Sequence, residues 1–154
     1  SKYVDNVKDW WLKETGTNMY DLREEAMTIL QEASRLEEIA SVVGESALSD
    51  ENRLIILIGE LIREGFLVQN AYHEVDTYCP PRKQVLILKT LLEFYDKVKP
   101  LVDAGVPFTE IEKLEVLGDL GRLKFLKDDQ VEEAIRDIKM RLEKELSQVK
   151  RAVI

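Results

Sequence analysis

Apolar side chains recur at three- and four-residue steps along most of this 154-residue chain. That spacing matches the 3.6-residue period of an α-helix and not the two-residue alternation of a half-buried strand. The clearest stripes run over residues 19–43, 50–62, 85–98 and 131–149. Seven glycines and four prolines are few for a chain that is 45% hydrophobic and 34% charged. We therefore predict an all-α fold, a single helical bundle of about six helices.

Caps and breakers set the expected helix limits in the first half. A short helix is predicted over Val4–Lys13 and a long one over Met19–Val43, which Gly44 ends because glycine favours the position after a helix. Ser49 is the expected N-cap of a third helix that begins at Asp50. The predicted apolar stripe of the long helix is Leu22, Ala26, Ile29, Leu30, Ala33, Leu36, Ile39, Ala40 and Val43.

Similar signals divide the second half. Pro81 suits the first turn of a fourth helix, and Pro100 is expected to stop or kink it. Thr109 is predicted to cap a helix over residues 110–126, and Asp129 to begin the last helix. The predicted apolar stripe of that last helix is Val131, Ile135, Ile138, Leu142, Leu146 and Val149.

The charge balance limits the classes of partner. Thirty acidic residues against 22 basic ones give a net charge of −8, with no basic cluster. Nucleic-acid backbones reward positive charge, so we expect no nucleic-acid partner and favour a basic protein surface. The single cysteine cannot form an internal disulfide and fits a reducing cytoplasm. No apolar run reaches the roughly 18–20 residues of a membrane span, so we expect no direct membrane insertion.

The segment 66–80 carries most of the unusual chemistry. It contains Tyr72 and Tyr78, six residues apart, and the neighbouring amides Gln69 and Asn70. Two rings flanked by hydrogen-bonding groups suit a flat heterocycle, since stacking a base on an aromatic ring contributes roughly 1–3 kcal/mol. The alternative is that the rings fill a gap between helices while the amides satisfy backbone groups. From the residues alone, packing is the preferred interpretation.

A metal site in this segment is a weaker hypothesis. His73, Glu74, Asp76 and Cys79 fall within seven positions, but structural zinc sites use four Cys or His ligands in paired spacings. Asp76 as a cap and Cys79 as a small packed side chain explain the same residues. We expect no metal ligand and no catalytic residue here.

The glycines give a negative result about catalysis. None of the seven occurs in the Gly-x4-Gly-Lys-Ser/Thr pattern that cradles a triphosphate, or in a dinucleotide fingerprint. The chain is therefore expected not to hydrolyse a nucleotide on its own.

A second candidate site is the acidic loop between the second and third helices. The residues at issue are Glu45, Ser46, Ser49, Asp50 and Glu51. Acids here favour the following helix N-terminus through its dipole, which would make the loop an ordinary hairpin. The functional alternative is a contact tip for a basic partner. Composition alone favours the ordinary hairpin.

Several sequence blocks, found in a fixed order along roughly the first hundred residues, change the preferred interpretation of both segments. They are Tyr3–Trp11, Leu22–Ala26, Leu36–Gly44, Ala47-Leu48, Leu61–Pro80, Lys83-Gln84 and Phe94–Asp96. Together they resemble the C-terminal helical domain of the catalytic A subunit of archaeal and vacuolar-type rotary ATPases. The likeness thins from about Pro100 onward. The family commonly has Asp, Gln and Phe where this chain has Gly65, Val68 and Tyr72.

The resemblance implies two site roles. Tyr72 and Tyr78 cover the adenine of bound ATP, with Gln69 and Asn70 beside them. The loop residues Glu45, Ser46, Ser49, Asp50 and Glu51 contact the central stalk.

It also implies the protein context. Residues 1–154 are the C-terminal helical domain of a larger catalytic subunit, whose N-terminal and phosphate-loop domains are absent from this chain. The chain is then no enzyme by itself and holds no cofactor alone, whereas the intact catalytic protein binds ATP or ADP with Mg²⁺. Its partners are the non-catalytic B subunit and the central-stalk subunits of a proton- or sodium-translocating ATPase. That complex is cytoplasmic and membrane-associated through its assembly. A free-standing acidic helical adaptor is the alternative.

Overall fold

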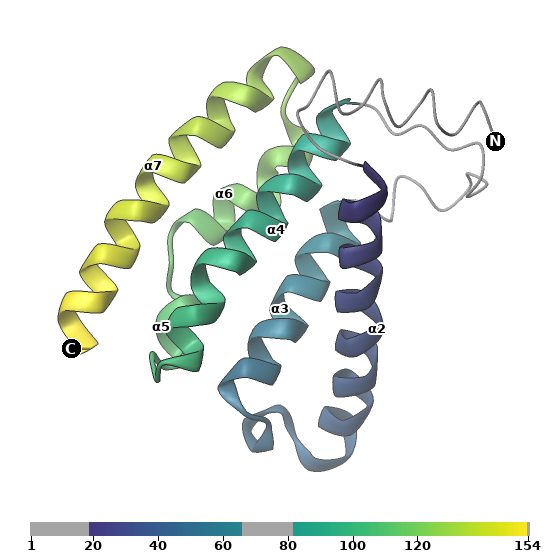
Figure 1. Ribbon diagram of the computed structural model, residues 1–154, viewed down its shortest axis with the longest axis vertical. Helices are drawn as coiled ribbons and strands as arrows, with labels where there is room; N and C mark the ends of the chain where they lie inside the picture. Colours follow the sequence, from purple (N-terminus) through teal and green to yellow (C-terminus); the bar gives the residue numbers. More distant parts are fainter. Residues whose placement is uncertain (1–18, 66–81, 154) are drawn as a thin grey trace.

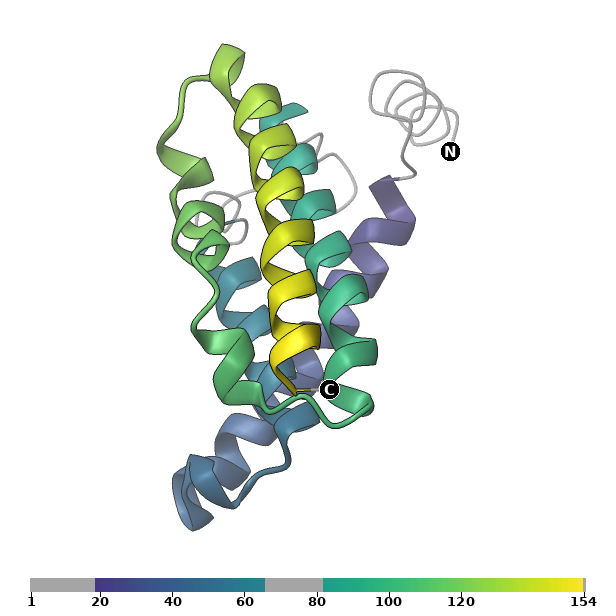
Figure 2. The same ribbon diagram turned by 90° about the vertical axis from the view of Figure 1, so that its left-hand side faces the viewer.

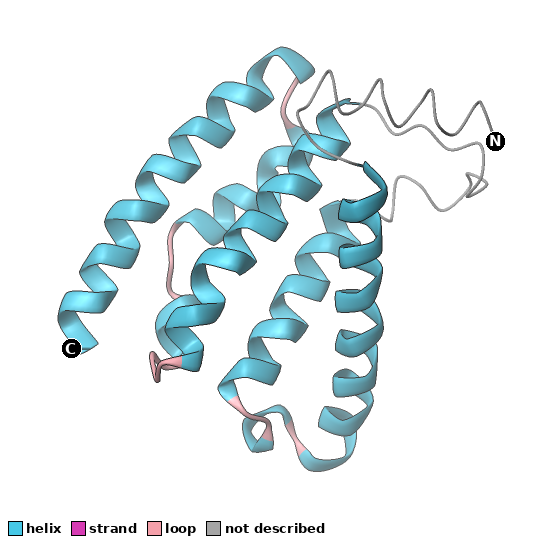
Figure 3. Cartoon of the chain, viewed as in Figure 1, coloured by secondary structure: helices cyan, strands magenta, loops and turns pink. Residues whose placement is uncertain are grey.

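The computed structural model describes residues 19–65 and 82–153. Within these two ranges the chain forms six α-helices and no strand, which confirms the predicted all-α fold (Figure 3). The expected helix over Val4–Lys13 lies outside the described residues. The elements are α2 (Met19–Val43), η1 (Glu45–Ala47, a 3-10 turn), α3 (Asp50–Gly65), α4 (Arg82–Asp103), α5 (Phe108–Glu112), α6 (Val116–Arg122), η3 (Leu123–Phe125, a 3-10 turn) and α7 (Asp128–Val153).

The long helices lie side by side as a bundle (Figure 1). α2 and α3 form a hairpin, α4 packs against α3, and α7 covers α4 and α6. The turn between α2 and α3 projects beyond the ends of α4 and α7 in both views (Figures 1 and 2). The fold therefore has one narrow end made by the hairpin alone.

One hydrophobic core joins these helices. α4 lies at its centre, with Leu91, Phe94 and Val98 each no more than 2% exposed. α2 and α3 approach most closely at Gly59, where an added Cβ would stand 2.6 Å from the Cβ of Ala33. Burial of such side chains stabilises the bundle by roughly 25 cal/mol per Å² of apolar surface.

Of the two outcomes expected at Pro100, a stop or a kink, the stop is wrong. α4 continues to Asp103, with Pro100 inside it, and the Ala104 N–H donates to the Pro100 carbonyl at 3.0 Å. Pro100 is exposed. Proline removes one backbone donor, and on an exposed face water can satisfy the carbonyl that loses it. The chain instead leaves the helix at Gly105, whose φ of +109° favours glycine.

The single helix predicted over residues 110–126 is also wrong. This stretch forms α5, α6 and η3, and Thr109 lies inside α5, which Pro107 precedes. The reason is tertiary: buried Leu114 lies between α5 and α6, and Glu145 of α7 accepts the first amides of α6. α7 itself begins at Asp128, one residue before the expected start, where Gln130 accepts the Lys127 N–H at 3.4 Å.

Candidate functional site

The residues expected to cover adenine cannot be placed. Gln69, Asn70, Tyr72 and Tyr78 lie outside the described residues, as do the four residues weighed as metal ligands. The structure describes the two elements that flank this segment, α3 ending at Gly65 and α4 beginning at Arg82. Both of these helix ends lie away from the α2–α3 turn (Figure 1).

The loop between α2 and α3 is fully described, and we call residues 44–51 the acidic tip. Gly44, at φ +90°, turns the chain out of α2, and its N–H donates to the Ala40 carbonyl at 2.8 Å. One 3-10 turn, η1, follows. Ser49 then caps α3 as predicted, because its Oγ accepts the Asn52 N–H at 3.2 Å. The acidic tip is thus a short turn between two helices, held by backbone and capping hydrogen bonds.

Four of the five residues predicted to contact a partner are exposed, and the fifth is partly buried. Glu45, Ser46 and Glu51 are exposed. Ser49 is exposed too, but its hydroxyl serves as the cap of α3. Asp50 is partly buried, and its Oδ2 accepts the backbone N–H of Phe108 at 3.1 Å. That bond ties the base of the tip to the start of α5.

Acidic side chains along α2 and α3 interact with the charge of the acidic tip. Partial burial raises the pKa of Glu60, and the neighbouring charges of Glu37, Glu45 and Glu64 raise it further. Arg63 opposes this effect and pairs with Glu37 at 3.4 Å. Glu45 of the acidic tip therefore lies near enough to Glu60 for their charges to interact, and Arg53 borders the same small hollow as both carboxylates.

Sequence reasoning missed an apolar part of this site. Ile39, Val42 and Val43 at the end of α2 are 38%, 84% and 56% exposed. Ile39 and Val43 belong to the predicted apolar stripe of α2, but the stripe is buried only up to Leu36, because α2 extends past the helices that cover it. No local signal marked these residues, because adjacent apolar residues such as Ile29 and Leu30 are both buried earlier in the same helix.

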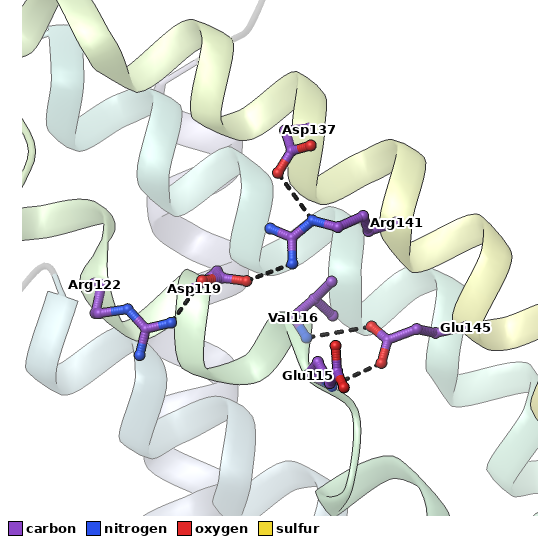
Figure 4. A network of polar contacts seen from close by, with 7 residues as sticks. All are labelled: Glu115, Val116, Asp119, Arg122, Asp137, Arg141 and Glu145. Carbon is purple, nitrogen blue, oxygen red and sulfur yellow. Dashed lines mark hydrogen bonds and ion pairs between the residues drawn. The ribbon is translucent and has the colours of Figure 1, made fainter.

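Figure 4 shows a polar network that joins α6 to α7. Unlike the acidic tip, this network lies between two packed helices. Asp119 accepts from Arg141 at 2.7 Å and from Arg122 at 2.6 Å, and Arg141 also donates to Asp137 at 2.9 Å. The bond from Arg141, with that from Arg122, holds the pKa of Asp119 below its ordinary value. Glu145 accepts the N–H groups of Glu115 and Val116 at the start of α6. These groups satisfy one another, so the network joins two helices and offers no free binding group.

Two features are absent from the described residues. In residues 19–65 and 82–153, no cluster of three His, Cys, Asp or Glu side chains is placed to hold a metal ion. Across the same residues, every helix is too short or too polar to cross a membrane.

Comparison with known proteins identifies the class. Residues 8–111 match the family described as the C-terminal domain of V and A type ATP synthase. This match covers more than half of the chain, which therefore belongs to that family. α5 closes the matched region, whereas α6, η3 and α7 follow it.

Individual relatives indicate which subunit of such an ATP synthase this chain resembles. The chain is similar to the A subunit of the A-type ATP synthase of Methanopyrus kandleri, 46% identical over 149 residues, which cover 97% of this chain and 25% of that protein. It is similar to the A subunit of the A-type ATP synthase of Pyrococcus horikoshii, 48% identical over 128 residues, 83% of this chain and 13% of that protein. The chain thus corresponds to a C-terminal domain of the A subunit and spans a quarter or less of these two relatives.

Proposed function

We propose that this chain serves as the C-terminal domain of the catalytic A subunit in an ion-translocating rotary ATPase. In this role it covers the adenine of bound ATP and, through the projecting acidic tip, contacts a basic central stalk. The observation that carries the proposal is the projecting acidic tip, with exposed acids beside exposed apolar side chains, in a chain of this family.

The tip contact rests on charge and exposure together. Glu45 and Glu51 supply negative charge, while Val42 and Val43 supply apolar surface that a partner can bury. Interfaces commonly combine a buried apolar centre with a polar rim, and complementary charge sets orientation and rate of association. The partner that fits is a stalk helix with basic and apolar residues on one face. Asp50 supports the tip through α5 rather than contacting the partner directly.

Charge reversal tests the tip contact. In the assembled ATPase, Glu45→Lys with Glu51→Lys should weaken attachment of the stalk and make it less sensitive to salt, because screened attractions are removed. Glu133→Lys, which alters an acid on α7, is the matched control. Sedimentation of the complex over a salt series measures the effect. Stalk attachment equal to that of the control would reject the contact.

The adenine role rests on the family and on the residue types. We infer that Tyr72 and Tyr78 stack on the adenine of ATP or ADP with Mg²⁺, and that Gln69 and Asn70 lie alongside. The phosphate-binding and catalytic groups are supplied by other parts of the catalytic protein or by the neighbouring non-catalytic B subunit. Changing both tyrosines to Ala should raise the nucleotide Kd about tenfold or more, a loss of about 1.4 kcal/mol. An unchanged Kd would mean that the rings only pack.

The proposed nucleotide contact and the proposed stalk contact together suggest a mechanical role. ATP held mainly elsewhere draws the domain inward, and the tip then presses on the stalk. Such coupling operates only as far as nucleotide affinity differs between the open and closed states. We further expect the assembled complex to move protons or sodium ions and to be cytoplasmic, attached to the membrane through its other components.

The chain itself is proposed to have no ATPase activity. Phosphate release by the purified chain with Mg²⁺ and ATP checks this, and turnover above background would contradict it. The alternative function is a free-standing acidic adaptor, which the same exposed tip would also serve. A reading frame that continues upstream into a phosphate-loop domain would exclude the adaptor.

A further inference from the structure

The base of the acidic tip is held to the bundle by two contacts that converge on one residue of α5. Asp50, in the first turn of α3, accepts the Phe108 N–H at 3.1 Å. Three residues later, the guanidinium carbon of Arg53 lies 4.8 Å from the centre of the Phe108 ring. We call Asp50, Arg53 and Phe108 the α5 anchor. It joins the start of α3 to the start of α5 through a backbone group and a ring.

Phe108 is a fixed point for these contacts. Its side chain is 4% exposed and packs in the main core, as does that of Ile111 in the same helix. The first N–H groups of a helix lack partners within it, and Pro107, which precedes α5, gives no side-chain cap. Asp50 therefore supplies, from another helix, the acceptor that the start of α5 requires. A hydrogen bond to a carboxylate is stronger than one between neutral groups.

Arg53 joins the anchor at a cost in stability. Its Nε is buried, and among the described residues no acceptor lies within hydrogen-bond distance of that atom. A buried donor without an acceptor is unfavourable, whereas the ring of Phe108 attracts the cation. Glu45, in η1 of the acidic tip, lines the same hollow of about 130 Å³ as Arg53 and Phe108. The guanidinium thus borders the space between the tip and α5.

The opposite side of the tip has no comparable support. Ile39, Val42 and Val43 of α2 are 38%, 84% and 56% exposed, and the turn projects beyond the ends of α4 and α7 (Figures 1 and 2). A force applied to the tip must therefore be carried to the bundle through α3 and its contacts with α5.

We propose that the α5 anchor makes the acidic tip and the bundle move as one body, with Asp50 as its main positioning residue. The inference rests on the proposed stalk contact and mechanical role. A moving domain passes its displacement to a partner only if the contacting segment does not bend relative to the rest. Supports that hold a contact loosely lose function even when the contacting groups are present.

The test measures stalk rotation against a viscous load, together with ATP hydrolysis, in the assembled ATPase. Asp50→Ala removes the acceptor, whereas Asp50→Asn removes the charge and keeps an acceptor oxygen. Asp129→Ala, which removes an exposed acid from the first turn of α7, is the matched control. We expect Asp50→Ala to keep its stalk and its rate of hydrolysis, while rotation per ATP falls about twofold to tenfold. Asp50→Asn should recover part of the loss.

Two results for Asp50 would overturn the proposal. One is rotation per ATP in Asp50→Ala equal to that of Asp129→Ala. The other is an equal defect in Asp50→Asn and Asp50→Ala, because the effect would then come from the charge of Asp50 and not from its bond to Phe108.

Arg53→Met separates positioning from stability. It keeps an apolar side chain near Phe108 and removes both the guanidinium and the unpaired buried donor. We expect a melting temperature no lower than that of the parent chain, with rotation per ATP below that of the control. A lower melting temperature with unchanged rotation would make the contact purely structural and overturn its part in the proposal.

The proposed stalk contact is tested separately by Glu45→Lys with Glu51→Lys, which leaves Asp50, Arg53 and Phe108 in place. If that variant weakens stalk attachment while Asp50→Ala rotates the stalk like its control, only the anchor inference is rejected. If the charge-reversed variant holds the stalk as well as its own control, the stalk contact is rejected and this inference falls with it.

Discussion

α2 and α7 are the two longest described helices, with 25 and 26 residues, yet the bundle uses them differently. The predicted stripe of α7 is buried at Val131, Ile135, Ile138, Leu142 and Leu146, with Val149 partly covered. The stripe of α2 is buried only as far as Leu36, and its last turns stand clear of the bundle. An apolar stripe thus shows which face of a helix can be buried. The length of the neighbouring helices decides how much of that face is buried.

The largest expected difference in the free energy of unfolding comes from truncating one apolar side chain in α7 and one in α2. Leu142→Ala should lower the free energy of unfolding by about 2–5 kcal/mol, since Leu142 is 3% exposed and its loss leaves a cavity. Val42→Ala should change it by less than about 0.5 kcal/mol, because Val42 is 84% exposed. Urea unfolding of the two variants measures both values. A large loss for Val42→Ala would mean that the tip is covered in the free chain.

A glycine in each half provides the second test. Gly59→Ala would place a Cβ 2.6 Å from that of buried Ala33, and forcing α2 and α3 apart should cost about 1–3 kcal/mol. The better helix propensity of alanine offsets up to about 1 kcal/mol of this loss. Gly121→Ala in α6 meets nothing within 4 Å and should stabilise the chain slightly. Thermal unfolding of both variants would contradict this if Gly59→Ala were the more stable.

The smallest expected effects are opposite pH dependences. Asp119 has a folded pKa lowered from 3.8 by Arg141 and Arg122, so its stabilisation is present above 3.8 and is lost as pH falls through the folded pKa. Asp119→Asn should therefore be less stable than the parent chain at pH 6, and the difference should vanish in acid. Glu60 has a folded pKa raised from 4.5 by burial and by neighbouring acids. Glu60→Gln should be more stable at pH 7, and that gain should disappear below 4.5.

Urea midpoints from pH 7 down to about pH 2 measure both differences. Lys144→Met, remote from both carboxylates in sequence and on an exposed face, serves as the reference variant. If Asp119→Asn and Glu60→Gln changed the free energy of unfolding in the same direction at neutral pH, the predicted opposite pH dependences would be wrong.

Local signals predicted much of this fold correctly. Helix periodicity located α2, α3, α4 and α7, and the tip was found from Gly44 and the capping residue Ser49. The errors occurred where a distant residue decides the local structure. Glu145 starts α6 from another helix. Of the candidate site, the acidic residues were assigned from the resemblance. The bond of Asp50 to the Phe108 amide could not be predicted, because it joins residues 58 positions apart.

The sequence by itself determined that the chain is helical, which faces are apolar and where the acidic turn lies, because period and capping are properties of neighbouring residues. Tertiary structure decided that Val42 and Val43 remain exposed, that Asp50 supports α5, and that Lys83 reaches η3. Coverage of a surface and the reach of one side chain to a distant carbonyl depend on where helices end in space. No local pattern encodes that placement.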